Sequence, residues 1–534
     1  MRFTTAERMA KIDREAIDGH QIAEAALMET AGQLTARHAR NWFLAEERRD
    51  GVVVLCGKGH NGADGMVAAR WLAKWGYHLH VVLVADEEEL SEMGQKQLVS
   101  LHKDKSIQVT KYESGEVLPG ADLYIDALLG TGLNGDPREP YTEIIDRLNR
   151  KPQPVVSVDI PSGLCGDYHM PYSPCVDADL TVTFGLPKLG SLLEPGYTRA
   201  GKLVVQELGF PEETYRKLAG PCHLITPFDA FEFLPQRRAT DHKGTSGRVM
   251  LVAGSKNYPG AAFLTANAAS RAGAGLVSII GPEKLSENQT AGERDLIFSE
   301  TQQELLEEKL ESEDFLNFLN KQHALIIGPG LGRSPKKAKL LKQLLPRISQ
   351  PAVIDADGLN NLKSHLELLE QLDRAVLTPH PGELARLLDR GINYVLSKPL
   401  ESAQKLVDIS GQTVVLKTSR PIVVHPDESY SINVSGSAAL AKAGSGDVLS
   451  GFIGALLGAG LNPGPAATLA CYLHGAAGRH AASKSTELAV RAEDVINGLP
   501  AALKELQTGQ MPDWFPIQFE SHSPETLRWH PFAS

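Results

Sequence analysis

The sequence predicts an α/β protein with two doubly wound domains, and three observations lead to this prediction. Short, continuous apolar runs alternate with glycine-rich turns and helical periodicity, which is the pattern of buried parallel strands connected by helices. The chain has 534 residues, which is more than a single hydrophobic core usually supports. The pattern fades at about residues 212–235, where proline and charged residues dominate, and we place a linker there.

The first half begins with a helical segment and continues with buried strands. Apolar residues recur at helical spacing over residues 5–41, and a second helix is predicted from Met66 to Trp75. The predicted strands are the apolar runs at residues 52–56, 79–84, 122–126, 154–158, 180–184 and 202–205. This alternation predicts a parallel sheet in a first domain at residues 1–220.

The second half repeats this plan in a domain that we place at residues 221–505. Its predicted strands lie at residues 248–253, 274–277, 325–327, 353–354, 376–377 and 414–416, with a helix at 260–272. An apolar run predicts a further buried helix whose first turn begins near Asp447. The tail, residues 506–534, carries Trp514, Trp529 and several prolines, and we interpret it as a surface strap or as disorder.

The composition argues against several classes of function. The net charge is −11, so no basic face is available for nucleic acid or for an anionic membrane. The five cysteines form no C-x-x-C pair and no metal-ligand spacing, which is typical of reduced thiols in the cytoplasm. We find no signal peptide and no apolar stretch long enough to span a bilayer. We therefore expect a cytoplasmic protein that acts on small molecules and forms a homo-oligomer.

The stretch Lys-Ala-Gly-Ser-Gly-Asp-Val-Leu-Ser-Gly at residues 442–451 predicts an anion site at the start of a helix. Free N–H groups and the positive end of the helix dipole attract anions there. Gly444 and Gly446 allow a phosphate to approach the backbone closely. Asp447 would repel a phosphate, so we interpret it as a base that faces a hydroxyl group to be activated. The alternative is that Asp447 only caps the helix.

Two glycine-rich turns in the first half also indicate a phosphate-containing ligand. Residues 57–62 and residues 130–135 both fit the pattern G-x-G-x-x-G after a predicted strand. One such match is a weak signal, because glycine turns follow strands in many α/β folds. Two matches in one domain favour a ligand rich in phosphate.

Polar residues follow several strands of the first half at the point where each strand ends. Asn61, Asp126, Asp159 and Ser162 all lie at or just beyond the carboxyl ends of predicted strands. Open α/β sheets place ligands at that edge. Oxygen ligands that converge there without cysteine or histidine suit a hard cation. The alternative is that Asp126 and Asp159 only cap turns.

Four fragments of the first half resemble the NAD(P)H-hydrate epimerase family. They are Leu-Met-Glu-Thr-Ala-Gly, Gly-Lys-Gly-His-Asn-Gly-Ala-Asp-Gly, Asp-Ala-Leu-Leu-Gly-Thr-Gly-Leu and Val-Asp-Ile-Pro-Ser-Gly-Leu, in this order. The resemblance implies a Rossmann-like sheet and a potassium ion held by Asn61, Asp126 and Ser162. It also implies that Asp159 is catalytic and that the substrate is bound by His60, Asn61, Gly62, Ala63, Asp64, Gly130, Thr131, Gly132, Leu133, Asn134, Gly135 and Asp136. His60 and Ala63 depart from the family pattern, which has asparagine and glycine there.

Fragments of the second half resemble NAD(P)H-hydrate dehydratases of the ribokinase-like superfamily. They are His-Lys-Gly, Gly-Pro-Gly-Leu-Gly, Asp-Ala-Asp, Thr-Pro-His-Pro-Gly-Glu and Gly-Ser-Gly-Asp. The resemblance implies a ribokinase-like sheet, ADP or ATP as co-substrate, a magnesium ion on the nucleotide, and Asp447 as the base. It implies that the hydrate is bound by Ala262, Gly330, Gly332 and His380, and the nucleotide by Lys417, Thr418, Gly444, Ser445 and Gly446. Thr418 stands where the family usually has glycine.

Together the two resemblances imply a bifunctional enzyme that repairs hydrated NADH and NADPH. The second domain would phosphorylate the hydroxyl group at C6 of the nicotinamide ring and eliminate phosphate, because phosphate leaves more readily than water. It would accept one C6 epimer, and the first domain would interconvert the R and S epimers. The alternative is a ribokinase-type small-alcohol kinase fused to a non-catalytic nucleotide-binding module, since the Gly-Ser-Gly-Asp element fits such a kinase equally well.

Overall fold

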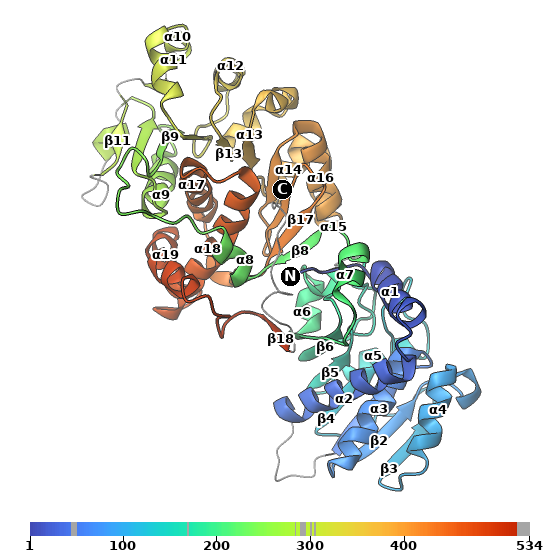
Figure 1. Ribbon diagram of the computed structural model, residues 1–534. Coiled ribbons are helices and arrows are strands. Elements are labelled where there is room, and N and C mark those ends of the chain that lie inside the picture. The colour runs from blue at the N-terminus through green and yellow to red at the C-terminus, as the bar shows by residue number, and fades with distance from the viewer. Residues whose placement is uncertain are drawn as a thin grey trace. The chain divides into compact units, whose positions relative to one another are not determined.

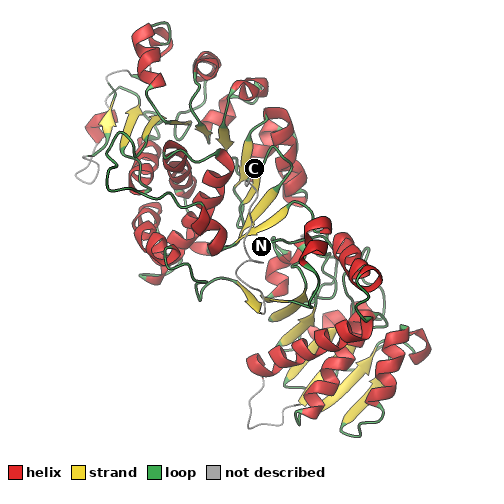
Figure 2. Ribbon diagram, viewed as in Figure 1, coloured by secondary structure: helices red, strands yellow, loops and turns green. Residues whose placement is uncertain are grey.

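The computed structural model describes residues 1–43, 51–167, 170–283, 285–288, 295–299, 302–303 and 306–520. The chain divides into two compact units, one of Met1–Cys222 with a C-terminal segment that starts at Phe515, and one of His223–Trp514. Each unit contains one largely parallel sheet covered by helices (Figures 1 and 2), so the predicted two doubly wound α/β domains are confirmed. The division after Cys222 lies two residues beyond the boundary expected from the sequence.

The first sheet has eight strands, and the order of the strands changes direction between β4 and β1. From edge to edge the strands are β18 (Ile517–Glu520), β7 (Lys202–Gln206), β6 (Leu180–Phe184), β5 (Val155–Val158), β4 (Leu123–Ala127), β1 (Gly51–Cys56), β2 (His78–Leu83) and β3 (Ile107–Lys111). All neighbouring strands run parallel. The carboxyl ends of β1 and β4 therefore form the switch point at which such sheets bind ligands.

The alternation of side chains along the strands explains why helices cover both faces of this sheet. On one face, Val52 and Val54 of β1 pack with buried residues of α2, α3 and α4. On the other face, Val53 and Leu55 pack with buried residues of α5. The helices of this unit are α1 (Ala6–Arg14), α2 (Glu24–Phe43), α3 (His60–Lys74), α4 (Glu92–Leu101), α5 (Tyr141–Leu148), α6 (Gly196–Ala200) and α7 (Glu212–Leu218).

Two helix predictions in the first half require correction. The helical segment predicted at residues 5–41 is divided into α1 and α2 by a π-helical turn, Glu15–Gly19, and by Gln21, whose φ of +55° is incompatible with a continuous helix. Helix α3 begins at His60 and not at Met66. The glycines that argued against an earlier start are required by packing, because a Cβ atom on Gly62 would lie 1.9 Å from the carbonyl oxygen of Gly57.

The tail contributes a strand to the first sheet. Strand β18 pairs in parallel with β7, and Ile517 is 1 % exposed. The interpretation of the tail as a surface strap or as disorder is therefore wrong for residues 517–520, while residues 521–534 lie outside the described residues. This strand could not be predicted from the local sequence, because a short apolar run after prolines does not indicate which distant strand it pairs with.

The second sheet has ten strands and a switch point between β9 and β12. The order is β11 (Ile297–Phe298), β10 (Leu276–Ile280), β9 (Arg248–Val252), β12 (Ala324–Ile327), β13 (Ala352–Ile354), β14 (Ala375–Leu377), β15 (Thr413–Leu416), β16 (Ile422–Val424), β17 (Tyr430–Asn433) and β8 (Cys222–Ile225). Strands β11 to β15 run parallel, whereas β16 is antiparallel to both of its neighbours β15 and β17. Strands β16 and β17 were not predicted from the sequence, where the strand at 414–416 is the last before the helix at Asp447.

Helix α17 (Ser445–Gly458) is the buried helix predicted near Asp447. It packs against α9 and β12, and a Cβ atom on Gly451 would lie only 2.4 Å from the carbonyl oxygen of Thr265 on α9. The other helices are α8 (Pro227–Glu232), α9 (Pro259–Arg271), α10 (Leu306–Lys309), α11 (Glu313–Asn320), α12 (Pro335–Leu344), α13 (Asp357–Asn361), α14 (Pro381–Leu387), α15 (Ile392–Ser397), α16 (Pro399–Ser410), α18 (Pro463–Ser483) and α19 (Ala492–Leu506).

The predicted linker at residues 212–235 is wrong, because α7, β8 and α8 occupy most of this segment. Pro227 is at the first position of α8, where a missing N–H group costs nothing, after a capping box made by Thr226 and Asp229. Much of the proline and charge content that suggested a linker therefore belongs to two short helices.

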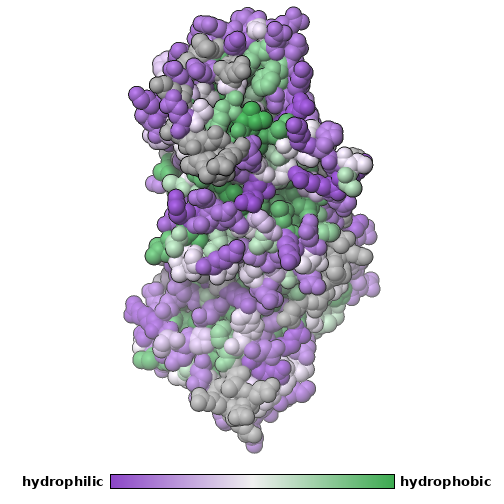
Figure 3. Space-filling view, turned by 90° about the vertical axis from the view of Figure 1, so that its left-hand side faces the viewer, coloured by the Kyte–Doolittle hydropathy of each residue, from purple (hydrophilic) through white to green (hydrophobic). Residues whose placement is uncertain are grey.

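On the face drawn in Figure 3 hydrophobic side chains gather in separate groups among hydrophilic ones. Within the described part of the chain, no helix combines the length and the hydropathy that a membrane span requires.

Candidate active sites

A cavity of about 720 Å³ lies at the switch point of the first sheet. The turn after β1 lines it with Lys58 and His60, and the turn after β4 lines it with residues 128–133. Asp13 of α1 and Met28 of α2 also line it. The cavity therefore combines backbone groups of two glycine-rich turns with apolar and acidic side chains from the helices.

The structure brings many of the predicted substrate-binding residues to this cavity, but not all of them. Among the described residues, its lining includes His60, Asn61, Asp64, Gly130, Thr131, Gly132, Leu133 and Asp159. Gly62 and Ala63 instead serve packing inside α3, where Ala63 is fully buried. Asn134, Gly135 and Asp136 continue the second turn, and Asp136 accepts a hydrogen bond of 2.9 Å from the Ser173 N–H group.

The two departures from the family pattern are accommodated locally. Ala63 lies within α3, so its backbone has the negative φ that an alanine requires there. The Nε2 atom of His60 lies 3.1 Å from an Oε1 atom of Glu24, at the first residue of α2. His60 therefore connects the starts of α2 and α3 at the rim of the cavity.

Asn61, Asp126 and Ser162 come together around the backbone of Leu129. The fully buried Asp126 carboxylate accepts hydrogen bonds from the Ser162 hydroxyl at 2.5 Å, the Ser162 N–H at 2.8 Å and the Ser157 hydroxyl at 2.8 Å. Asn61 donates to the Leu129 carbonyl oxygen at 3.3 Å, and the Ser162 hydroxyl lies 3.2 Å from the same oxygen. Burial raises the pKa of Asp126, although the hydrogen bonds from Ser162 oppose this.

Asp159 is held in a strained conformation beside a buried lysine. Its φ is +63°, and its Oδ1 atom accepts hydrogen bonds from the Thr183 hydroxyl at 3.1 Å and the Phe184 N–H at 3.2 Å. The Nζ atom of Lys188, whose side chain is 2 % exposed, lies 2.5 Å from the same oxygen. Strain of this kind persists where surrounding contacts enforce it, and it is common at functional sites.

Sequence reasoning missed Lys188 and Asp13, although both line the cavity. Lys188 follows the turn after β6, so the rule that singled out polar residues beyond strand ends could have found it. Asp13 had no such signal, because it is an acidic residue on an amphipathic helix. Burial raises the pKa of Asp13 to about 6, although Lys188 partly opposes this. Burial and the neighbouring Asp159 and Asp13 raise the pKa of Asp64 well above its usual range.

In the second unit, Asp447 lies in the first turn of α17. The helix begins after Gly444, where the chain turns with a φ of +88°. The free N–H groups of the first turn of α17 are therefore those at and next to Gly446. Burial and the negative charge of Asp355 raise the pKa of Asp447 to about 7. Asp447 is thus a carboxylate that can gain or lose a proton near neutral pH, as a general base must.

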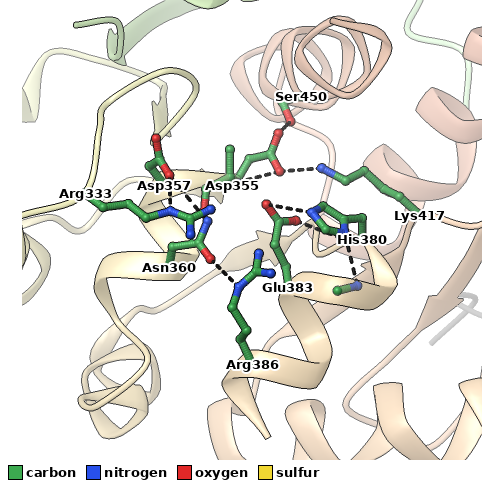
Figure 4. Close-up of polar contacts among 11 residues, drawn as sticks. Arg333, Asp355, Asp357, Asn360, His380, Glu383, Arg386, Lys417 and Ser450 are labelled. Carbon is green, nitrogen blue, oxygen red and sulfur yellow. Dashed lines mark hydrogen bonds and ion pairs between the residues drawn. The ribbon is translucent and has the colours of Figure 1, made fainter. Parts of the chain in front are cut away.

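A buried ion pair joins the ends of β13 and β15 in the second sheet and contacts α17 (Figure 4). Asp355, just beyond β13, accepts hydrogen bonds from the Lys417 ammonium group at 2.6 Å and from the Ser450 hydroxyl at 2.7 Å. Burial lowers the pKa of Lys417, but Asp355 and Glu383 outweigh this, and the net pKa is raised. Lys417 therefore keeps its charge close to Asp447. Sequence reasoning quoted the Asp-Ala-Asp fragment but did not name Asp355 or Ser450 as site residues.

His380 caps α14 at the neighbouring strand end. Its backbone N–H donates to the Glu383 carboxylate at 2.8 Å, and its Nε2 atom lies 3.5 Å from the other carboxylate oxygen of Glu383 (Figure 4). Burial and the charge of Lys417 lower the pKa of His380, so the imidazole is neutral at pH 7. Arg386 and Arg333 lie at the same edge and bind Asn360 and Asp357.

The glycine turn after β12 approaches the start of α9. Gly330 has a φ of +63°, and a Cβ atom there would lie 2.6 Å from the carbonyl oxygen of Tyr258. Gly332 donates its N–H to Asp357 at 2.9 Å. Ala262 of α9 is fully buried, so its side chain supports the turn at Gly254 from behind.

The remaining predicted nucleotide-binding residues surround the start of α17. A Cβ atom on Gly446 would lie 3.2 Å from the Lys417 Nζ atom, so the helix start and the lysine are adjacent. The Ser445 hydroxyl lies 3.1 Å from Nε2 of His474, whose pKa burial lowers to about 4. Thr418 donates its hydroxyl to the Arg420 carbonyl oxygen at 2.6 Å, so the threonine closes its own turn.

Comparison with known proteins finds matches along nearly the whole chain. Residues 249–501 match the family described as NAD(P)H-hydrate dehydratase, and residues 24–190 match the family described as YjeF-related protein N-terminus. The chain is 37% identical over 530 residues to the bifunctional NAD(P)H-hydrate repair enzyme Nnr of Moorella thermoacetica, covering 95% of this chain and 97% of the relative. It is 35% identical over 499 residues to the Escherichia coli enzyme of the same name, covering 92% of each chain.

Among solved structures, the second half is similar to the ADP/ATP-dependent NAD(P)H-hydrate dehydratase of Bacillus subtilis. The identity is 27%, the match covers 53% of this chain and 98% of that chain, and the TM-score is 0.46.

Proposed function

Because this chain belongs to the family of bifunctional NAD(P)H-hydrate repair enzymes, we propose which of its residues perform the two reactions. The protein interconverts the R and S epimers of the C6 hydrates of NADH and NADPH, and it dehydrates the S epimer back to NAD(P)H with the help of a nucleotide. The kinase alternative is not favoured, because the relatives match both halves in one chain.

We assign epimerisation to the cavity at the switch point of the first sheet. Its two glycine turns would bind the phosphates and the nicotinamide end of the hydrate, through His60, Asn61 and residues 130–133. Asp159 would act on the proton of the C6 hydroxyl group, because its carboxylate lines the cavity and is held in place by Lys188. The observation that supports this assignment is the Asp159–Lys188 pair at the wall of a cavity large enough for the nicotinamide end of the substrate.

The site around Asp126 fits a potassium ion. Among the described residues, the partners of the buried Asp126 carboxyl group are hydroxyl and N–H groups, and no cationic side chain influences its pKa. Asn61, Ser162 and the Leu129 carbonyl group offer neutral oxygen atoms beside it. One carboxylate with several neutral oxygens suits a hard cation. A bound potassium ion would neutralise Asp126 and fix substrate oxygens near Asp159.

Replacement of Asp126 by alanine is expected to weaken potassium activation and epimerisation while dehydration of the S epimer continues. The half-saturating potassium concentration should rise by about 10- to 100-fold, because the carboxylate supplies charge and orients Ser162. Epimerisation of separated R and S hydrates is measured against potassium concentration in the absence of nucleotide.

The matched control is Asp122→Asn, since Asp122 lies just before the amino end of the same strand and accepts a hydrogen bond from Gly51. Asp126→Asn removes the negative charge but keeps the size of the side chain, so it tests the contribution of the charge alone. An epimerase that is indifferent to potassium and to both Asp126 substitutions would contradict the potassium site.

We assign dehydration to the start of α17 in the second unit. Asp447 would take the proton of the C6 hydroxyl group while that oxygen attacks the terminal phosphoryl group of ADP or ATP. The N–H groups at residues 444–446 would stabilise the transferring phosphoryl group, and Lys417 adds positive charge beside them. Loss of phosphate from C6 and of a proton from C5 then restores the ring double bond. His380 and the turn at 328–332 would face the hydrate.

We also propose a magnesium ion, a cytoplasmic location, a nucleotide co-substrate and a homo-oligomer for this protein. Magnesium would accompany the nucleotide phosphates, and its charge would supplement that of Lys417. The cytoplasmic location is supported by the five cysteines, which are all free and buried in the described residues. Use of ADP or of ATP and assembly as a homo-oligomer stay predictions. Near-ultraviolet absorbance, which NADH has and its hydrate lacks, tests the dehydration with each nucleotide in turn.

The rate of dehydration is expected to rise with pH through about 7. Asp447 is a base only when it is ionised, and burial raises its pKa to about 7. Below this value the carboxyl group is protonated and cannot accept the hydroxyl proton, so the rate should fall about tenfold for each further pH unit. The pH profile of kcat with saturating nucleotide measures this. A rate that stays flat between pH 5 and pH 8 would remove Asp447 as the base.

A further inference from the structure

The carboxyl group of Asp13 lies at the epimerase cavity, and among the described residues it has no bonding partner. Asp13 is on α1, is partly exposed, and lines the cavity together with Asp159 and Lys188. Within the described part of the chain its carboxyl group takes part in no hydrogen bond and no ion pair. A carboxyl group that reaches a substrate cavity with its bonding capacity unused is free to bind the substrate.

Asp13 and Asp159 are neighbours in opposite electrostatic situations. The Oδ1 atom of Asp159 accepts three hydrogen bonds, one of them from the ammonium group of Lys188. Among the described residues, Asp13 has no such donor. Burial and the negative charge of Asp159 raise the pKa of Asp13 to about 6, although Lys188 opposes this. One carboxyl group is thus held as an acceptor, and the other can gain or lose a proton near neutral pH.

Other titratable groups also lie near Asp13. Asp64 and Glu24 line the same cavity, and Asp64 is itself held in its neutral form by burial and by the nearby carboxylates. From α7, Tyr215 approaches Asp13, and its hydroxyl group donates to Glu207. Of these charged groups, Asp159 favours a proton on Asp13, and Lys188 opposes it.

We infer that Asp13 is a further catalytic residue of the epimerisation, a general acid that protonates the ring nitrogen N1 while Asp159 removes the proton of the C6 hydroxyl group. This rests on the assignment of the cavity as the epimerase site. Two carboxyl groups in one cavity, one paired with a lysine and one without such a partner among the described residues, resemble the pairing of base and acid that proton transfer requires.

The chemistry of the hydrate explains why an acid is needed at N1. Carbon C6 carries both a hydroxyl group and the ring nitrogen, so it is a hemiaminal carbon. When Asp159 takes the hydroxyl proton, the electron pair forms a C6=O bond, the C6–N1 bond breaks, and its electron pair accepts the proton of Asp13. The product is an open-chain aldehyde with an N–H group at N1, and the two carboxyl groups have exchanged their protonation states.

Closure of the ring completes the epimerisation and restores the enzyme. Rotation about the C5–C6 bond presents the other face of the aldehyde to N1, which attacks C6 and returns its proton to Asp13. The aldehyde oxygen takes back the proton of Asp159 and becomes the hydroxyl group of the other epimer. No oxidant, nucleotide or water is consumed.

Opening of the ring also avoids the step that the other domain needs a nucleotide to perform. Breaking the C6–O bond would expel water or hydroxide, a poor leaving group. Breaking the C6–N1 bond leaves an amine nitrogen conjugated with the ring double bond and the carboxamide, and a single proton suffices. The first domain contains an acid and a base for this, and its reaction uses no nucleotide.

The test is Asp13→Asn in the full chain, with separated R and S hydrates and no nucleotide. Asparagine keeps the shape of the side chain but cannot donate a proton as an acid does. The epimerisation kcat is expected to fall by about 100-fold or more, with the KM for the hydrate changed by less than about threefold. Asp18→Asn, an exposed aspartate five residues along the chain and outside the cavity, is the matched control.

The measurements distinguish the role of Asp13 from the assignment of the cavity as the epimerase site. Wild-type protein that does not interconvert the epimers would overturn the epimerase assignment, whereas equal rates for wild type and Asp13→Asn would overturn only the role of Asp13. Asp13→Glu, which restores an acid, should recover at least tenfold over Asp13→Asn. Nucleotide-dependent dehydration of the S epimer shows that each variant is folded in its second domain, and circular dichroism compares the whole chain.

An isotope measurement on the wild-type enzyme tests the bond that breaks, independently of any variant. In water enriched in oxygen-18, ring opening retains the original C6–O bond, so early product epimer should contain the original oxygen. Incorporation of one labelled oxygen for each epimerisation would mean that C6–O breaks, and the role of Asp13 at N1 would be wrong.

Discussion

Replacement of Asp447 by asparagine is expected to lower nucleotide-dependent dehydration by about a hundredfold or more while the nucleotide still binds. The Asp447 carboxylate lies in the first turn of α17, beside Lys417 and above the Asp355–Lys417 ion pair. A carboxylate there repels phosphate, so binding does not need it, and its raised pKa suits a base. An amide has almost the same shape but cannot accept the hydroxyl proton.

The measurement is near-ultraviolet absorbance with the S hydrate and saturating ADP or ATP, with nucleotide affinity determined by calorimetry. Asp389→Asn is the matched control, because Asp389 is exposed in the same unit and asparagine tolerates its φ of +52°. Epimerisation should be unaffected in both variants. Turnover by Asp447→Asn at the wild-type rate would remove the assignment of the base.

Replacement of Asp159 by asparagine is expected to divide the repair of a mixture of epimers into a fast and a slow phase. The S epimer should be dehydrated at the wild-type rate, since the second domain is untouched. The R epimer should follow only as fast as it epimerises spontaneously, because the variant lacks the carboxylate that accepts the hydroxyl proton. Catalysed epimerisation should fall by about a hundredfold or more. Asparagine is chosen because the φ of +63° at this position would strain alanine.

The full chain is the appropriate material for this experiment, because β18 from the C-terminal segment completes the first sheet. A fragment of residues 1–220 would lack that strand and expose the edge of β7. The control is Asp146→Asn, an exposed aspartate on α5. A single fast phase from Asp159→Asn with mixed epimers would mean that this residue is not needed for epimerisation.

The sequence alone was sufficient for the fold class, and it identified the strand-end residues to which we assign the two sites. Buried parallel strands appear as continuous apolar runs, and polar residues directly after them must meet at one edge of the sheet. This local rule identified Asn61, Asp126, Asp159 and Ser162. The structure places all four at or just beyond the carboxyl ends of β1, β4 and β5. The glycine-rich stretch likewise identified the start of α17.

The same rule failed where local composition misleads. The segment at 212–235 contains the prolines and charges of a linker, yet it forms two short helices and a strand that joins the second sheet. Helix α3 begins at His60 despite its glycines, since Gly62 must lie against Gly57. In both cases contacts with distant residues outweigh the intrinsic preference of the segment.

Residues that act through distant partners were decided only by the tertiary structure. Lys188 is 29 residues from Asp159, Lys417 is 62 residues from Asp355, and Ser450 is 95 residues from Asp355, yet each pair is in hydrogen-bonding contact. Asp13 becomes a candidate acid only because the fold buries it near Asp159, and β18 is a strand only because β7 offers a free edge. The sequence determines which chemical groups stand at strand ends. Charge, burial and pairing depend on neighbours brought from elsewhere in the chain, and folding alone determines those neighbours.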